Sequence, residues 1–219
     1  MPPTSVGGSV VSEQGGVSIP ATRDPRPAPA LSPDPPQPPE GDPGGSRAEG
    51  PPDQLIVLGV DPGLQVTGWG IVLADGLALR SIACGAIATQ RKRSPEERLL
   101  QIYRELCDVI ERWRPAEVAV EEPFVAQNVR SALAIGEARA VALLAAAQAG
   151  LPVRPYAPAE VKLTVAGNGR SDKAQVQELV RVQLGLAAVA EPIDASDALA
   201  VAICHHLRRR AEERLANTR

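Results

Sequence analysis

The feature that most constrains this chain is a run of apolar residues, LIVLGV at 55–60, that ends in a single aspartate, Asp61. A nearly continuous apolar run bounded by turn residues is typical of a strand that is buried on both faces of a sheet. Pro-Gly follows the aspartate, and a second apolar run, TGWGIVL, begins at residue 67. We therefore predict a central strand over 55–60, with Asp61 at its end. Burial alone does not explain why a carboxylate stands there.

The pattern after this strand alternates between strands and helices. Runs at 67–73 and 78–89, separated by the turn ADG, indicate two more strands in an antiparallel meander. Ser94, Pro95 and Glu97 then form a capping-box pattern that predicts the start of a helix over 94–115. Two short strands are expected at 116–123 and 151–158, and four further helices at 131–150, 159–167, 171–186 and 194–210. This order predicts an α/β domain with a mixed five-stranded sheet flanked by helices.

The chain divides by composition into a tail and one domain. Residues 1–53 hold 14 of the 22 prolines, no aromatic residue and no apolar periodicity, so they lack the surface to offset the entropy of ordering. We predict a disordered Pro/Gly-rich tail there; its pattern matches neither a signal peptide nor a transit sequence. Residues 54–210 are long enough for one core, and 211–219 are expected to form a basic C-terminal tail.

Net charge does not argue against an anionic partner. The chain carries −3 overall, but the tail has 7 acidic and 3 basic residues, so the remaining 19 acidic and 20 basic residues leave the domain near +1. The segment HHLRRRAEERLANTR closes the chain with five arginines. A solvated last helical turn favoured by the helix dipole and a phosphate-binding segment explain this pattern equally well.

The cysteines and the hydropathy indicate a reducing, aqueous compartment. Cys84, Cys107 and Cys204 form no C-x-x-C pair and no even set, which argues against a disulfide framework or a zinc site. We expect small buried thiols in a cytoplasmic protein. No apolar run reaches the roughly 18 residues of a membrane span, so no membrane contact is expected.

Four carboxylates occupy positions from which they could converge. Asp61 and Glu121 each end an apolar strand, where α/β sheets place their ligands. Asp194 and Asp197 lie three residues apart at the start of the last helix and therefore share a face. Clustered carboxylates repel one another and raise their pKa values unless cations hold them. Oxygen ligands suit Mg²⁺ or Mn²⁺, and two such ions about 4 Å apart promote phosphodiester cleavage.

Each acid also has a simpler explanation. Asp61 before Pro-Gly could form a turn, and Asp194 could be a helix N-cap with Asp197 favoured by the helix dipole. Glu121 and Glu122 face opposite sides of their strand, so only one of them can join the cluster. The alternation of apolar residues does not decide which one.

Four segments in series carry a resemblance to a known family. In chain order they are LGVDPGLQVTGWGIV, AVEEPFVAQNVRSALAIGEARAVA, YAPAEVKLTVAGNGRSDKAQVQ and DASDALAVAICH. Together they cover about 55–206 and resemble the RuvC family of bacterial Holliday junction resolvases. The resemblance implies an RNase H-like fold and a homodimer, to which the helix at 131–150 contributes. It also implies a Mg²⁺-dependent endodeoxyribonuclease that nicks two strands of like polarity at a four-way junction.

The resemblance assigns roles to individual residues. The implied metal ligands, for two Mg²⁺ or Mn²⁺ ions per subunit, are Asp61, Glu121, Asp194 and Asp197. Some relatives carry histidine at the position of Asp194. The implied DNA contacts are Phe124, Lys162 and Lys173. The family also implies a branch-migration helicase complex of the RuvA and RuvB type as a partner, and roles in recombination and DNA repair.

These assignments have purely structural alternatives, and the chain as a whole has alternative functions. An aromatic residue beside the metals could stack on a junction base or simply pin a loop, and a lysine could contact phosphate or be a solvated helix-surface residue. The Asp-Pro-Gly turn also resembles the phosphate loop of actin-like ATPases, which need a second domain that 166 residues do not provide. The remaining rival is a catalytically silent four-way-junction binding protein of the same fold.

Overall fold

A mixed sheet of five strands forms the centre of the domain. The computed structural model describes residues 54–122 and 129–218. The strands are β1 (Gln54–Asp61), β2 (Val66–Asp75), β3 (Ala78–Ala88), β4 (Glu117–Glu121) and β5 (Val153–Tyr156). They lie in the order β3-β2-β1-β4-β5, so β1 is the central strand, as the sequence predicted.

The pairing of the strands determines which loops share a rim. β1 pairs antiparallel with β2 and β2 antiparallel with β3, which confirms the predicted meander. β4 runs parallel to β1, and β5 runs parallel to β4. The carboxyl ends of β1, β4 and β5 therefore lie at one rim, together with the end of β3 and the start of β2.

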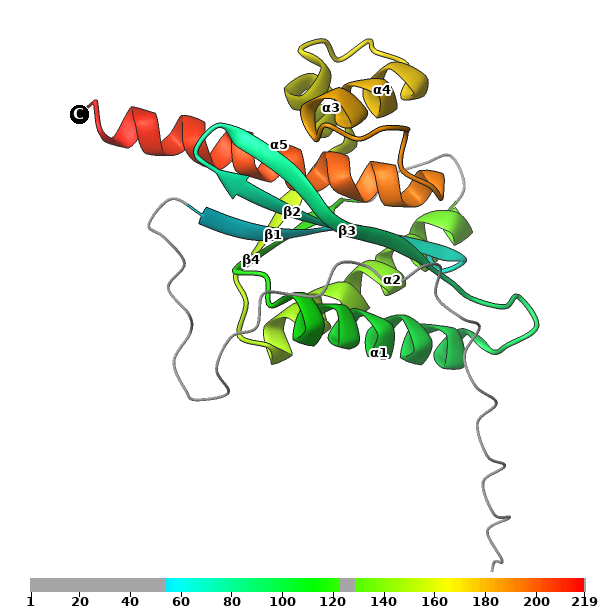
Figure 1. Cartoon of the computed structure of the whole chain (residues 1–219). Helices are drawn as coiled ribbons and strands as arrows, with labels where there is room; N and C mark the ends of the chain where they lie inside the picture. Colours follow the sequence, from blue (N-terminus) through cyan, green and yellow to red (C-terminus); the bar gives the residue numbers. More distant parts are fainter. Residues whose placement is uncertain (1–53, 123–128, 219) are drawn as a thin grey trace, which may run out of the picture. The chain divides into compact units, whose positions relative to one another are not determined.

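Helices cover both faces of the sheet (Figure 1). They are α1 (Pro95–Trp113), α2 (Val129–Gln148), α3 (Pro158–Ala166), α4 (Lys173–Gln183) and α5 (Ile193–Ala216). α1 and α2 pack on one face in a core that includes Leu58 and Val120. α5 packs on the other face, with α3 and α4 beyond it, in a core that includes Val57 and Ala119. The sheet thus lies between two sets of helices, as the alternation of strands and helices in the sequence predicted.

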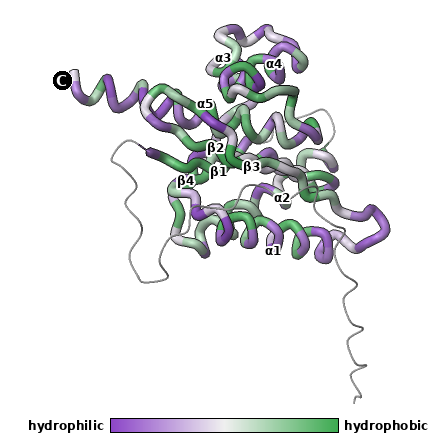
Figure 2. Tube along the Cα trace, in the orientation of Figure 1, coloured by the Kyte–Doolittle hydropathy of each residue, from purple (hydrophilic) through white to green (hydrophobic). Residues whose placement is uncertain are grey.

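The first helix begins where the capping box predicted. The Ser94 hydroxyl accepts a hydrogen bond from the Glu97 N–H at 3.4 Å, and a Glu97 carboxylate oxygen accepts one from the Ser94 N–H at 3.0 Å. The apolar stripe of α1, which includes Ile102 and Leu106, is buried, while its outer face is hydrophilic (Figure 2). α2 buries the small residues Ala138, Ala142, Ala145 and Ala146.

Three glycines allow α5 to lie close against the sheet. A Cβ at Gly59 would be 2.8 Å from the backbone nitrogen of Ala202 and would clash with the carbonyl of Ala198. A Cβ at Gly70 would be 2.7 Å from a methyl carbon of Leu199. A Cβ at Gly68 would clash with the backbone of the first turn of α5. A side chain at any of these positions would push α5 outward, so glycine fixes how deeply the helix sits.

The remaining sequence predictions concern the chain ends, the thiols and the membrane. α5 continues to Ala216, through residues that the sequence analysis placed in a basic tail. The tail predicted for 1–53 lies outside the described residues. All three cysteines are free; Cys204 is buried, and Cys84 and Cys107 are partly buried. None of the described helices is both long and apolar enough to cross a bilayer.

Candidate active site

Asp61 is the last residue of the central strand and faces α5. Side chains alternate along β1, so Asp61 points to the same face as Gly59 and Val57, whose neighbours belong to the α5 side of the core. Burial raises the pKa of Asp61 to about 6, and the charges of Asp197 and Asp194 add to this effect. A carboxylate with these neighbours holds its proton more tightly than one in water.

Glu121 occupies the equivalent place on the neighbouring parallel strand. It ends β4 and alternates with Ala119, which packs on the α5 side of the core. Burial raises the pKa of Glu121 to about 8, with further contributions from the charges of Asp61 and Asp197. The positive charges of Lys173 and Lys162 act in the opposite direction. The two strand-end carboxylates are therefore electrostatically coupled across the rim.

The register distinguishes Glu121 from its neighbour Glu122. Glu122 faces the other side of the sheet, where its carboxylate lies 3.6 Å from the guanidinium of Arg139 in α2. Val118 and Val120 belong to that same side of the core. The structure thus answers the question that the alternation of apolar residues left open, and the acid that faces α5 is Glu121.

Asp194 and Asp197 lie in the first turns of α5, directly above the rim. The backbone of Asp194 lies against Gly68, and Gly68 is the residue paired with Asp61 in the β1–β2 register. Pro192 is the N-cap of α5, so Asp194 is not the cap residue that the simpler explanation required. The depth at which α5 sits on the glycines therefore controls how near these carboxylates come to Asp61. Glycine inside a strand pattern is the sequence signal that could have indicated this close approach.

Lys173 supplies a positive charge to this cluster. Its Nζ lies 2.6 Å from a carboxylate oxygen of Asp197. Burial alone would lower the pKa of Lys173, but the hydrogen bond to Asp197 and the charges of Asp197, Asp61 and Asp194 raise it overall. The ammonium group is therefore held charged beside the carboxylates. Lys162 lies on α3, close enough to Glu121 to lower the pKa of that carboxyl.

The four carboxylates are oxygen donors of the kind that bind a hard divalent cation, but their side chains are spaced too widely to coordinate one. The acids share one rim, and a cation among them would relieve the repulsion that raises the pKa values of Asp61 and Glu121. Within 54–122 and 129–218, however, no three His, Cys, Asp or Glu side chains are close enough together to hold a metal ion. The two findings agree, because charges interact over several Å whereas coordination needs oxygens at about 2.1 Å from Mg²⁺.

Comparison with known proteins identifies the family of this chain. A sequence model of the family described as "Crossover junction endodeoxyribonuclease RuvC" matches residues 57–205, from the central strand to α5. The chain belongs to the RuvC family. The match contains all four carboxylates and both lysines discussed above.

Members of the RuvC family from several bacteria are similar over nearly their whole length. The crossover junction endodeoxyribonuclease RuvC of Chloroflexus aggregans is 55% identical over 151 residues, which cover 69% of this chain and 92% of that protein. The protein of the same name from Pelotomaculum thermopropionicum is 50% identical over 151 residues, with the same coverage of 69% and 92%. The domain therefore spans nearly all of a RuvC protein.

Solved RuvC structures share the fold. Thermus thermophilus RuvC in complex with a Holliday junction substrate matches with a TM-score of 0.69 and 35% sequence identity, over 72% of this chain and 96% of that chain. A second Thermus thermophilus RuvC structure matches with a TM-score of 0.67. The RNase H-like fold that the resemblance implied is confirmed.

Two further features bear on the sequence predictions for a RuvC domain. Phe124, the candidate aromatic DNA contact, lies outside the described residues.

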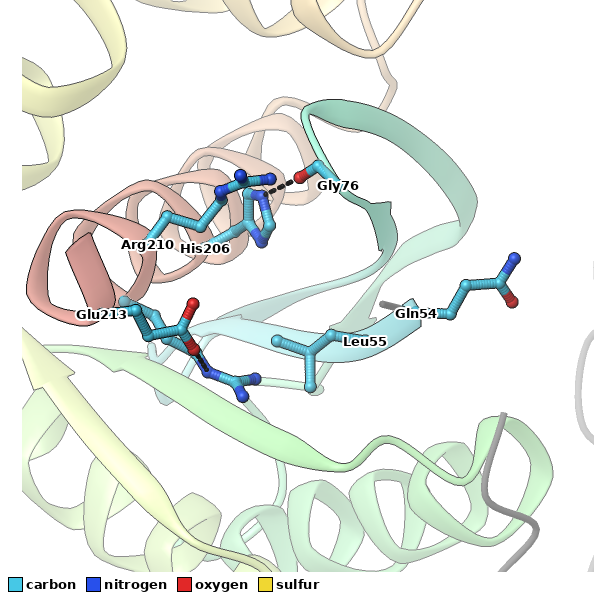
Figure 3. Close-up of a pocket in the computed structure, with 7 residues that line it drawn as sticks. Gln54, Leu55, Gly76, His206, Arg210 and Glu213 are labelled. Atoms are coloured by element: carbon cyan, nitrogen blue, oxygen red, sulfur yellow. Dashed lines mark hydrogen bonds and ion pairs between the residues drawn. The ribbon is translucent and has the colours of Figure 1, made fainter. Parts of the chain in front are cut away.

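A pocket of about 240 Å³ lies at the opposite end of α5, where His206 and Arg210 approach the start of β1 and the turn at Gly76 (Figure 3). It is at the rim opposite the carboxylates, so the cavity in Figure 3 is separate from the candidate active site.

Proposed function

We propose that this protein is a structure-selective endonuclease that resolves Holliday junctions in recombination and DNA repair. In this proposal it nicks two strands of like polarity symmetrically across the junction. Membership of the RuvC family supports it, as does the similarity to a RuvC structure with a Holliday junction substrate. The observation that carries the proposal is the placement of Asp61 and Glu121 at the ends of neighbouring parallel strands, beneath the first turns of α5.

The four carboxylates would hold the catalytic metal. We assign Asp61, Glu121, Asp194 and Asp197 as ligands for Mg²⁺, or Mn²⁺, with two ions per subunit. When bound, such a pair activates a water molecule and stabilises the leaving oxygen of a phosphodiester. The chain holds these carboxylates in fixed positions. Asp61 and Glu121 end the paired strands β1 and β4, and the other two acids begin α5, which packs on glycines of the sheet.

Lysines on the α3 and α4 side would bind the DNA beside the carboxylates. Lys173 already places its ammonium within 2.6 Å of Asp197, at the edge of the cluster. A charged amine at this position can contact the backbone phosphate and stabilise charge that develops during cleavage. We assign Lys162 a similar contact, and we retain Phe124 as the residue that stacks on a junction base.

A homodimer would supply the two active sites that paired cuts need. α2 exposes Val129, Leu133 and Leu144, whose large apolar side chains are 71%, 62% and 58% exposed. Gly136, on the same helix, has open space where a Cβ would stand. An apolar helix face with room for close approach fits a second copy of the chain, and a two-fold dimer matches the approximate two-fold symmetry of a junction. By family resemblance we also propose a cytoplasmic location and a helicase partner of the RuvA and RuvB type.

A silent junction-binding protein is the alternative function, and one pair of variants separates the two. We expect Asp61→Asn to bind a synthetic four-way junction with wild-type affinity and to lose nicking. Glu122→Gln is the matched control, because its carboxylate lies on the other face beside Arg139; it should bind and nick normally. Wild-type nicking by the Asp61→Asn protein would contradict the metal assignment, and a wild-type protein that binds junctions but never nicks would favour the alternative.

A further inference from the structure

Two of the arginines near the end of the chain, Arg208 and Arg209, are occupied by ion pairs within the protein. Arg208 Nε lies 2.9 Å from a carboxylate oxygen of Glu160. Arg209 Nη1 lies 2.9 Å from Glu117, and its Nε lies 3.0 Å from Glu213. These ion pairs tie α5 to α3 and β4 and reduce the charge that this end of the helix offers to a partner. These two arginines are therefore poor candidates for phosphate binding.

A second basic segment, the turn between β3 and α1, is arranged differently. Arg91, Lys92 and Arg93 are three consecutive exposed cations. No carboxylate of the described residues forms an ion pair with any of them. Among the described residues, the one side-chain hydrogen bond that these three cations make runs from Arg91 Nη2 to the Gln65 side chain, at 2.8 Å. Figure 2 shows this connection as a strongly hydrophilic segment. Its three positive charges remain available to an external anion.

The turn is fixed against the loop that follows Asp61. The Thr89 N–H donates to the carbonyl of Gln65 at 3.0 Å, and the Thr89 hydroxyl donates to the carbonyl of Leu64 at 2.6 Å. Arg98, in the first turns of α1, donates to that same Leu64 carbonyl at 3.0 Å and to the Thr89 hydroxyl at 2.9 Å. These contacts hold the basic turn on the rim that carries the carboxylates, where Figure 1 also places the start of α5.

The acids nearest to this turn do not neutralise it. Glu97 uses its carboxylate to accept the Ser94 N–H in the capping box. Glu96 is exposed, and its pKa is lowered by a hydrogen bond with Ser94 rather than by a basic side chain. The three consecutive cations of the turn thus exceed the two nearby negative charges even before Arg98 is counted.

Positive charge therefore borders the carboxylates on two sides. Lys162, Arg170 and Lys173 lie on the α3 and α4 side, and the basic turn lies on the α1 side. Strand cleavage requires the negatively charged backbone to approach four carboxylates, so phosphate-binding groups on both flanks would hold the DNA against that repulsion. A contact of this kind depends on charge and not on base sequence.

We propose that Arg91, Lys92 and Arg93 form a phosphate-binding site for a duplex arm of the junction on the α1 side of the active site. The inference rests on the proposed function, because it supplies the DNA that the turn would hold. Each phosphate neutralised by a cation contributes about 0.9 to the slope of log affinity against log salt concentration. Three contacts would account for a slope of about 2 to 3.

The test compares two triple variants of the full chain. We would measure binding of a synthetic four-way junction over a range of NaCl concentrations, in EDTA so that the slope reports only monovalent counterions. The variant R91Q/K92Q/R93Q is expected to reduce the slope by about 2 to 3 and to weaken binding at least tenfold at low salt. The control R154Q/R208Q/R209Q removes the same net charge from arginines that are ion-paired within the protein, and it is expected to change the slope by less than about 1.

The outcomes separate this inference from the proposed function. A wild-type protein that binds and nicks junctions, with an unchanged slope for the 91–93 variant, would overturn the inference alone. Equal losses in the two triple variants would also overturn it, because a general effect of net charge would then explain the result. A wild-type protein that binds no junction would overturn the proposed function and this inference with it. Far-ultraviolet circular dichroism of both variants would show that α1 and α5 remain folded.

Discussion

Replacement of Glu121 by glutamine should stabilise the metal-free protein, although it removes an active-site group. In the folded chain the pKa of Glu121 is raised from 4.5 to about 8, by burial first and then by the charges of Asp61 and Asp197. Such a carboxyl favours its neutral form, and glutamine has nearly the same shape without a charge. Wild-type folding is destabilised at any pH at which Glu121 is ionised in the unfolded chain, because folding must then protonate or bury that carboxylate. Glutamine removes this destabilisation.

The sign and size of the effect follow from linkage. Below about pH 4, Glu121 is protonated in both the folded and the unfolded chain, so the variant should gain nothing. Between about pH 4.5 and pH 8 the unfolded chain loses the proton while the folded chain keeps it, and wild-type stability falls. The full shift corresponds to at most about 5 kcal/mol. Partial exposure and the sharing of repulsion among the acids reduce our expectation to about 2 kcal/mol at pH 8.

Thermal unfolding in EDTA measures this difference. A gain of about 2 kcal/mol corresponds to a rise in Tm of roughly 4 to 8 °C for a domain of this size. Glu122→Gln is the control, because its carboxylate pairs with Arg139 on the other face, and it should leave Tm unchanged or slightly lower. An equal or lower Tm for Glu121→Gln at pH 8, or a gain that persists at pH 4, would refute the reasoning.

Two other substitutions test how the site is built. Gly59→Ala should lower the free energy of unfolding by about 1 to 3 kcal/mol, because its methyl group would stand 2.8 Å from the Ala202 nitrogen and push α5 outward; an unchanged melting curve would contradict this packing. Lys173→Met should move the rising limb of the pH–rate profile of cleavage to higher pH, because the lysine charge lowers the pKa values of Asp61 and Glu121. A profile that stays in place or moves to lower pH would show that Lys173 does not act on these carboxylates.

Local sequence signals predicted most of the fold. The run at 55–60 identified the central strand because a strand covered on both faces is apolar nearly throughout and turn residues bound the run. The capping box at Ser94 fixed the start of α1 because both of its hydrogen bonds are local. Asp61 and Glu121 were placed at one rim because each directly follows an apolar run, and parallel strands end on the same side of a sheet.

Features that depend on contacts between distant segments could not be derived from local patterns. Alternation alone did not choose between Glu121 and Glu122; the family resemblance assigned Glu121, and the structure shows that Glu121 is the acid that faces α5. The seating of α5 on glycines of β1 and β2 depends on residues more than 120 positions apart in the sequence. The arginines near the C-terminus and those at 91–93 look alike in sequence. Only the structure shows that Arg208 and Arg209 of the first group pair with acids from α3, β4 and α5.

The measurement that tests the central claim most directly is cleavage of an end-labelled four-way junction beside a linear duplex of the same sequence, with Mg²⁺ and with EDTA. The account predicts paired nicks in strands of like polarity, which ligase can reseal, in the junction alone and only with the metal. Tight junction binding without nicks under any divalent metal would contradict it. Cleavage that persists in EDTA would equally contradict the assignment of Asp61, Glu121, Asp194 and Asp197 as metal ligands.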